Sequence, residues 1–185
     1  MNLVGTLTPL EVWVVALGLV VIYTDWRYHK IYNWATFPSI LGGWGLQLWL
    51  WREGGKLVRH GLAGFAVGIA LTIVPFALGL LYAGDVKYLA AVGALTNPGF
   101  VVWTVLYGGV CHGILSLILL RREQLLIAFK NIGRFFYRRA ILQMPVDFQA
   151  ESEGTLPYGI SLALGSFLTL GFRLYYGAYF PLWAN

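Results

Sequence analysis

The sequence predicts an all-α, polytopic integral membrane protein with about six transmembrane helices. Of its 185 residues, 58% are hydrophobic and 11% are charged, and the mean hydropathy is +0.69. In soluble globular domains roughly a quarter of the residues are charged. Several uncharged runs approach the roughly 20 residues that a helix needs to cross the hydrocarbon core. This composition leaves no room for a sizeable soluble domain, so residues 1–185 are predicted to form one membrane-embedded domain.

The transmembrane helices are expected in apolar segments that end at charged residues, glycines or prolines. Their approximate ranges are 8–24, 34–51, 61–81, 85–95, 100–120 and 156–176. The first segment lacks a basic leader and a small-residue cleavage site, which indicates a retained helix rather than a signal peptide. The fourth is too short to cross a bilayer alone, so we expect its neighbours or a water-filled cavity to shelter it.

Residues 121–144 differ in composition and predict a basic amphipathic helix. Apolar residues recur there at helical spacing, while Lys130, Arg134 and Arg138 recur every four residues. Such helices lie flat on membranes that contain anionic lipids. An acidic loop at 145–153 follows, so residues 121–153 are predicted to form a cytoplasmic part. A nucleic-acid partner is not expected, because the apolar face of the helix needs burial.

The basic residues favour one orientation in the membrane. Four of the 13 Lys and Arg residues, namely Arg52, Lys56, Arg59 and Arg173, lie on one side of the predicted helices, and the others lie on the opposite side. Because cytoplasmic segments carry the excess of basic residues in such proteins, the sequence predicts a multi-pass protein of the cell membrane. Its N-terminus is then outside, and Asp25 and Asp85 lie at the cytoplasmic face.

Asp25 and Asp85 are the two acids at the cytoplasmic ends of apolar segments. Ionisable residues in or beside membrane segments are candidates for function, although a solvated loop end explains Asp85 equally well when it is taken alone. Two carboxylates in a partly dry site do not both ionise easily, so such a pair holds one proton. The ionised member can take a proton from water while the other donates to a carbonyl oxygen. This suffices for peptide hydrolysis without a metal or cofactor.

Three stretches carry a family resemblance. They are Thr24-Asp25-Trp26-Arg27 with Ile31-Tyr32-Asn33, then Ala83-Gly84-Asp85-Val86-Lys87 and the residues up to Gly93, and finally Leu156-Pro157-Tyr158-Gly159-Ile160. They resemble, in the same order, the first aspartate with its downstream I-P-N, the G-x-G-D-V-K motif, and the P-Y-G entry to the last helix of the prepilin peptidases. These enzymes are membrane aspartyl proteases of the GxGD class.

The resemblance implies an aspartic-type endopeptidase with Asp25 and Asp85 as its catalytic pair. The substrate would be a type IV-like prepilin, a membrane protein whose leader peptide is cut at the cytoplasmic membrane face. The residues implied to bind substrate or support the pair are Gly84, Lys87, Pro157, Tyr158 and Gly159. The sequence lacks the paired-cysteine insertion of the larger, bifunctional relatives, so no methyltransferase activity is expected. The short, peptidase-only members are associated with tight-adherence pili or with archaeal pilins and archaellins.

Two positions depart from the family pattern, and both carry tyrosine. Tyr82 takes the place of the first glycine of G-x-G-D, and Tyr32 that of the proline of I-P-N. We expect Tyr82 to crowd the approach to Asp85 and to affect substrate fit more than the chemistry. For the supporting residues, structural roles stay open: Lys87 as a cation that reaches the membrane surface, and Pro157 with Gly159 as a helix start.

Two other classes of function would use the same acids. A proton-coupled transporter would use them as a relay, although the sequence has no inverted repeat and no pair of broken helices. A structural subunit of a pilus or secretion assembly would hold an inactive or incidental acid pair, and Tyr82 keeps this alternative open. A cleavage assay separates these possibilities from a peptidase.

Overall fold

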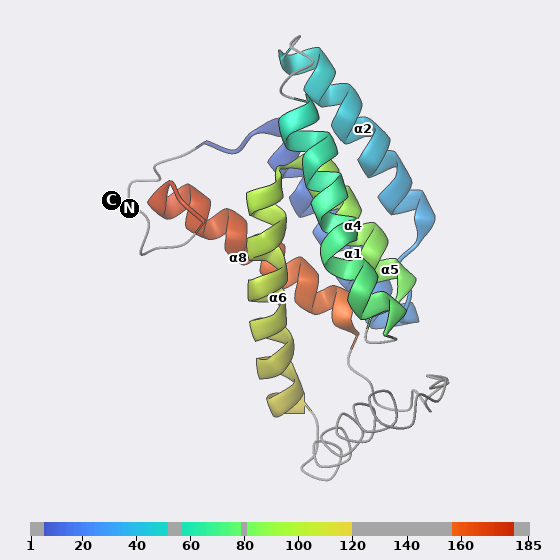
Figure 1. Cartoon of the computed structure of the whole chain (residues 1–185). Coiled ribbons are helices and arrows are strands. Elements are labelled where there is room, and N and C mark those ends of the chain that lie inside the picture. The colour runs from blue at the N-terminus through green and yellow to red at the C-terminus, as the bar shows by residue number, and fades with distance from the viewer. Residues whose placement is uncertain (1–5, 52–56, 79–80, 120–156, 180–185) are drawn as a thin grey trace. The chain divides into compact units, whose positions relative to one another are not determined.

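The computed structural model describes residues 6–51, 57–78, 81–119 and 157–179. In chain order the helices are α1 (Pro9–Tyr28), α2 (Asn33–Trp51), the π-helix η1 (Leu57–Leu62), α4 (Ala63–Ala77), α5 (Ala83–Leu95), α6 (Pro98–Leu119) and α8 (Tyr158–Tyr176) (Figure 1). The described residues contain no strand, which confirms the predicted all-α class. The predicted amphipathic helix at 121–144 and the acidic loop at 145–153 lie outside the described residues.

The chain divides into two compact units. The first combines Met1–Cys111 with Pro157–Asn185, and the second is His112–Leu156. Helices α1 to α5, the first part of α6 and α8 belong to the first unit, and so do all the residues of the sites discussed below. A single domain over residues 1–185 stays a prediction.

Three stretches of helix in the described part of the chain are long and apolar enough to cross a membrane. They are α1, the stretch Arg59–Ala77 across η1 and α4, and Pro98–Ile118 of α6. The expectation of six transmembrane helices is not confirmed beyond these three. Helix α5 has only 13 residues, and α2 and α8 contain polar side chains such as Gln47 and Ser166 that are buried inside the protein.

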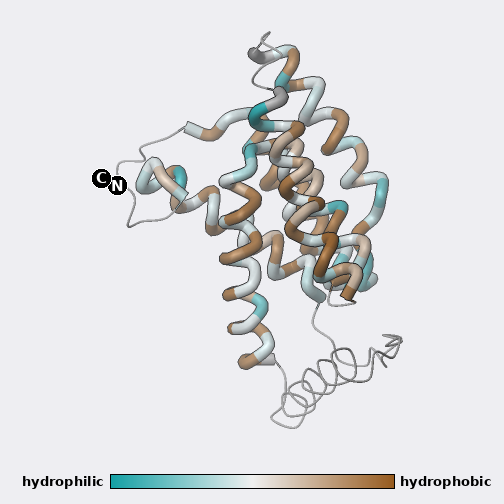
Figure 2. Tube along the Cα trace, in the orientation of Figure 1, coloured by the Kyte–Doolittle hydropathy of each residue, from teal (hydrophilic) through white to brown (hydrophobic). Residues whose placement is uncertain are grey.

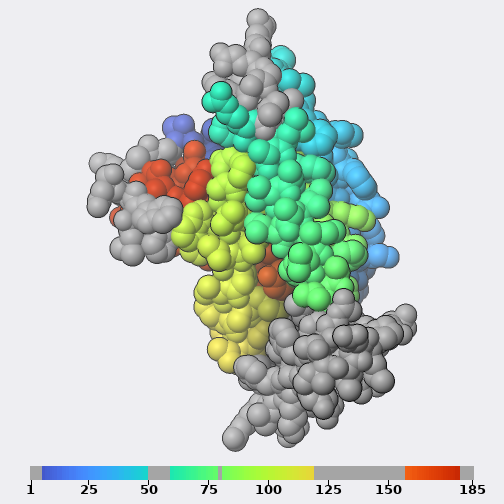
Figure 3. Space-filling view, in the orientation of Figure 1, coloured from blue at the N-terminus to red at the C-terminus, as the bar shows by residue number. Residues whose placement is uncertain are grey.

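Helix α4 and the first part of α6 present hydrophobic side chains outward. Both helices are hydrophobic along most of their length (Figure 2), and their side chains cover one face of the molecule (Figure 3). The exposed large hydrophobic residues on them include Ile73, Val74, Val102, Leu106 and Val110. Large exposed apolar surfaces of this kind are typical of regions that contact a membrane or another protein.

Helix α5 is sheltered by its neighbours, as its short length requires. All of its residues from Tyr88 to Leu95 are buried. Its backbone packs closely on that of α4 at Gly68. A Cβ atom on Gly68 would lie only 2.6 Å from the carbonyl oxygen of Leu89. Gln47 of α2 donates a hydrogen bond of 2.8 Å to the carbonyl oxygen of Ala94. The helix is therefore held on several sides, which fixes the position of its first turn.

Helix α1 continues beyond its predicted end at residue 24. It runs to Tyr28, and His29 ends it in the left-handed conformation, with φ 49° and ψ 42°. The sequence prediction stopped where the apolar run stops, but a helix needs only backbone hydrogen bonds and tolerates charged residues in its last turn. Asp25 thus lies on the helix itself. Helix α5 starts at Ala83 rather than at residue 85, so Asp85 lies within its first turn.

Candidate active site

Asp25 and Asp85 lie at the same end of the helix bundle. Glu11 at the start of α1 and Leu95 at the end of α5 line one pocket, so the two helices run in opposite directions. Asp25 in the last turn of α1 and Asp85 in the first turn of α5 are therefore both at the other end. The two carboxylates interact electrostatically, and their residues are only 6% and 3% exposed.

The carboxylate of Asp25 faces the start of α8. Its Oδ2 atom accepts a hydrogen bond of 3.2 Å from the backbone N–H of Ile160, and Gly159, the preceding residue, lies against the same carboxylate. The N-terminus of a helix carries a partial positive charge and free N–H groups, and both stabilise an anion. Helix α8 thus supplies the polar environment that a buried carboxylate needs.

Gly159 leaves the space that Asp25 occupies. A Cβ atom at this position would lie 2.6 Å from Oδ2 of Asp25 and 2.8 Å from Cδ1 of Ile31. Any residue larger than glycine would therefore push the carboxylate or the isoleucine away. The structure places this predicted supporting residue in direct contact with the acid.

Asp85 is held by the first turn of its own helix. Its Oδ2 atom accepts a hydrogen bond of 3.0 Å from the backbone N–H of Tyr82, the residue that precedes α5. An acid in the first turn also interacts favourably with the helix dipole. Burial and the nearby carboxylate of Asp85 raise the pKa of Tyr158, which is half-buried in the first turn of α8. Both acids thus lie at helix N-termini, Asp25 at that of α8 and Asp85 at that of α5.

Ile31 connects the surroundings of the two acids. A Cβ atom on Gly84 would lie 3.0 Å from Cβ of Ile31, and Ile31 also contacts Gly159 through its Cδ1 atom. The isoleucine therefore lies between the residue that precedes Asp85 and the residue that faces Asp25. The sequence prediction did not include Ile31 in the site. The signal that could have pointed to Ile31 is the pair of glycines, Gly84 and Gly159, because small residues at these positions leave space for a large side chain.

The remaining predicted site residues have structural contacts. Lys87 donates a hydrogen bond of 2.9 Å to Oδ1 of Asn33, the first residue of α2. Pro157 is the residue before α8, with φ −63° and ψ 115°, as expected for a helix start.

Tyr82 is 68% exposed, with an extended backbone that any residue can adopt. Its side chain is therefore not packed in the protein interior, and the expectation that it crowds the approach to Asp85 stays a prediction.

A buried hydrogen bond fixes α5 relative to α8. The hydroxyl groups of Tyr88 and Ser166 lie 2.9 Å apart, and both residues are almost fully buried. Ser166 also donates to the carbonyl oxygen of Ala163 at 2.8 Å. Tyr88 is three residues after Asp85, so this contact lies about one turn from the acid pair.

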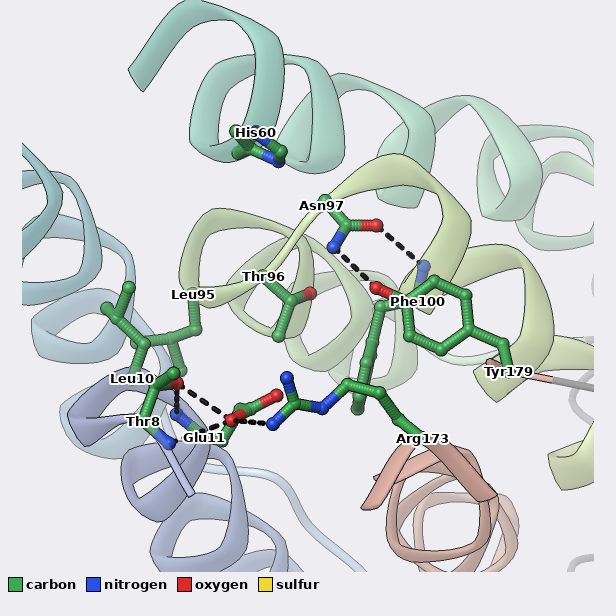
Figure 4. A pocket seen from close by; sticks show the side chains of 10 residues that line it. All are labelled: Thr8, Leu10, Glu11, His60, Leu95, Thr96, Asn97, Phe100, Arg173 and Tyr179. Carbon is green, nitrogen blue, oxygen red and sulfur yellow. Dashed lines mark hydrogen bonds and ion pairs between the residues drawn. The ribbon is translucent and has the colours of Figure 1, made fainter. Parts of the chain in front are cut away.

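A pocket of about 280 Å³ lies at the opposite end of the bundle (Figure 4). Its most buried charged residue is Glu11, whose carboxylate lies 2.8 Å from a guanidinium nitrogen of Arg173. The same carboxylate accepts hydrogen bonds from the backbone N–H and the hydroxyl of Thr8, at 2.9 and 2.8 Å. The sequence analysis did not predict this ion pair. This pocket is separate from the pair of aspartates.

In the described part of the chain, no three His, Cys, Asp or Glu side chains gather where a metal ion could bind. The two aspartates and the polar groups around them can, however, activate water and donate a proton to a carbonyl oxygen if they share one proton. This is the chemistry of a carboxylate pair that hydrolyses amide bonds.

A sequence model of the type IV leader peptidase family matches residues 12–117. This range is more than half of the chain and includes Asp25, Ile31, Asn33, Asp85 and Lys87, whereas the 157–160 stretch lies outside it. No curated protein and no solved structure gave a significant match.

Proposed function

Because the chain belongs to the type IV leader peptidase family, we propose that it is an aspartic-type endopeptidase of the membrane, with Asp25 and Asp85 as its catalytic residues. One observation carries the proposal. Three stretches that are far apart in the sequence meet around these two acids, because Ile31 contacts both Gly84 and Gly159 while Asp25 accepts a hydrogen bond from Ile160.

In the proposed mechanism the two carboxylates share one proton. The ionised carboxylate takes a proton from a water molecule, whose oxygen attacks the carbonyl carbon of the scissile peptide. The protonated carboxylate donates its proton to the carbonyl oxygen. The carboxyl group that took the proton from water then passes it to the leaving nitrogen as the C–N bond of the tetrahedral intermediate breaks. The other carboxylate takes a proton from a hydroxyl group of the intermediate, so the pair again holds one proton. The N-termini of α5 and α8 stabilise the negative charge that stays on the pair.

The proposed substrate is a type IV-like prepilin, whose leader peptide would be removed at the cytoplasmic membrane face. The position of the acids supports this choice. They lie at one end of helices α1 and α5, not in the middle, so a cut there falls where an apolar helix meets the polar leader. Burial of both acids also means that the substrate must bring its backbone to them in an extended form, since helical amides are occupied by their own hydrogen bonds.

The excess of basic residues supports a cytoplasmic position for the two acids. We further propose that anionic lipids surround this end of the protein.

A cleavage assay with the purified protein in detergent tests the proposal. The protein is incubated with a panel of type IV-like prepilins, and mass spectrometry identifies the new N-termini. The proposal expects one cut between the leader and the apolar helix, and no cut in a control peptide with an equally apolar span and no leader. A folded protein that cleaves none of the prepilins would contradict it. Proton uptake in liposomes without cleavage would instead favour a transporter.

A further inference from the structure

The connection between α1 and α2 lies against the first turn of α5. It consists of residues 29–32, and it begins four residues after Asp25, where the N–H of His29 donates to the carbonyl oxygen of Asp25 at 3.0 Å. Within it, Ile31 contacts Gly84 on one side and Gly159 on the other. The position of this short connection therefore determines how closely the first turns of α5 and α8 approach each other.

A hydrogen bond closes the connection on its exposed side. The Nζ atom of Lys87 donates to Oδ1 of Asn33 at 2.9 Å. Asn33 is the residue at which α2 begins, so the bond joins the end of the connection to α5. Lys87 is two residues after Asp85, and side chains at this spacing point to different faces of a helix. Lys87 thus acts on the connection rather than on the carboxylate of Asp85.

We infer that the Lys87–Asn33 hydrogen bond is a positioning latch for the two carboxylates. It holds residues 29–32 on α5 and keeps Ile31 between Gly84 and Gly159. Since Gly84 adjoins Asp85 and Gly159 faces Asp25, the latch sets the spacing of the pair. This role of Lys87 and Asn33 rests on the proposed peptidase function. It differs from that of a lysine whose charged group merely reaches the membrane surface, because such a lysine would act without Asn33.

A double-mutant cycle on prepilin cleavage tests the coupling between the two residues. Lys87→Met and Asn33→Ala should each lower kcat roughly three- to tenfold, which corresponds to the loss of one ordinary hydrogen bond, and should change KM less than twofold. The double variant should be no slower than the slower single variant. Asn33→Asp keeps an acceptor oxygen for Lys87, so it should retain most of the kcat of the parent protein. Lys30→Met, which removes an exposed cation from the connection itself, is the matched control and should keep kcat.

Hydrogen exchange measures the latch without cleavage. In an Asp85→Asn background, Lys87→Met and Asn33→Ala should both speed amide exchange in peptides that cover residues 29–33, and Lys30→Met should not. Unchanged exchange, or losses of kcat that add in the double variant, would overturn the latch. If the parent protein cleaves no prepilin, the proposed function fails, and faster exchange in both latch variants would still support the contact. The two failures are therefore distinguishable.

Discussion

Helix α1 carries two buried acids with opposite kinds of environment. Glu11 in the first turn is 7% exposed and Asp25 in the last turn is 6% exposed. They are 14 residues apart, or about 21 Å along the helix axis. Glu11 forms an ion pair with Arg173 and accepts two hydrogen bonds from Thr8 (Figure 4). Asp25 accepts a hydrogen bond from the backbone N–H of Ile160 and interacts electrostatically with a second acid, Asp85.

We propose that this difference separates a structural acid, Glu11, from a chemical one, Asp25. The ion pair gives Glu11 a partner of opposite charge and ties the start of α1 to the end of α8. The charge on Asp25 is stabilised by amides that are themselves neutral, and the nearby Asp85 disfavours ionisation of both acids at once. Burial alone therefore does not distinguish the two acids, whereas the nature of their partners does.

Among substitutions that leave both aspartates in place, the largest expected effect comes from filling the space at Gly159. Gly159→Ala should lower kcat by about a hundredfold, because its Cβ would displace the Asp25 carboxylate or Ile31, and a displacement of this size is enough for such a loss. Gly171→Ala is a matched control on the same helix, since a Cβ there meets nothing within 4 Å. Initial rates of prepilin cleavage and circular dichroism of both variants check the prediction. Equal activity of the two variants would show that Gly159 does not shape the site.

A smaller effect, on stability, is expected at the other end of α1. Glu11→Gln should lower the free energy of unfolding by roughly 2 kcal/mol, because it leaves the guanidinium of Arg173 without its anion. This figure is reduced because the Arg173 side chain is 25% exposed, so water compensates part of the loss. Thermal unfolding in detergent measures it, and Asp25→Asn is the comparison. A larger loss of stability in Asp25→Asn than in Glu11→Gln would break the distinction between the two acids.

The buried hydrogen bond between α5 and α8 should contribute less. Tyr88→Phe removes one hydroxyl from the pair with Ser166 and should lower stability by about 1 kcal/mol. It should also lower kcat a few-fold, since Tyr88 lies about one turn from Asp85. Ser166→Ala should have a similar effect, and the double variant should show that the two changes are not additive. Strict additivity in unfolding and cleavage would argue against this contact.

The smallest effect is expected at Tyr82. Tyr82→Gly restores the glycine of the family motif, and it should change kcat less than about twofold, because the side chain is exposed and glycine is also acceptable at the position before a helix. The backbone N–H that donates to Asp85 is retained. Cleavage rates with several prepilins measure the change. A large gain with every substrate would mean that Tyr82 obstructs the site after all.

The sequence predicted the acids but not all of the geometry that joins them. Asp25 and Asp85 were found because charge is rare in this chain, and the start of α8 because Pro157 precedes it. The last turn of α1 was missed because its residues are polar and aromatic, although they are compatible with a helix. Ile31 was missed because one apolar residue in an apolar chain gives no signal until the two glycines that it contacts are known. The number of transmembrane helices could not be settled by hydropathy. Buried polar side chains such as Gln47 lower the mean hydropathy of α2 although they do not face the lipid.

The most direct test of the account compares three acid-to-amide substitutions in one cleavage assay. Asp25→Asn and Asp85→Asn keep the size of the side chain and remove its ability to ionise, so each should lower kcat roughly a thousandfold or more. The double variant should be no slower than either single variant, because one member of a pair that acts together has little activity alone. Glu11→Gln should retain cleavage at a temperature where it is folded. Substantial leader removal by a well-folded Asp25→Asn or Asp85→Asn variant would contradict the proposed catalytic pair.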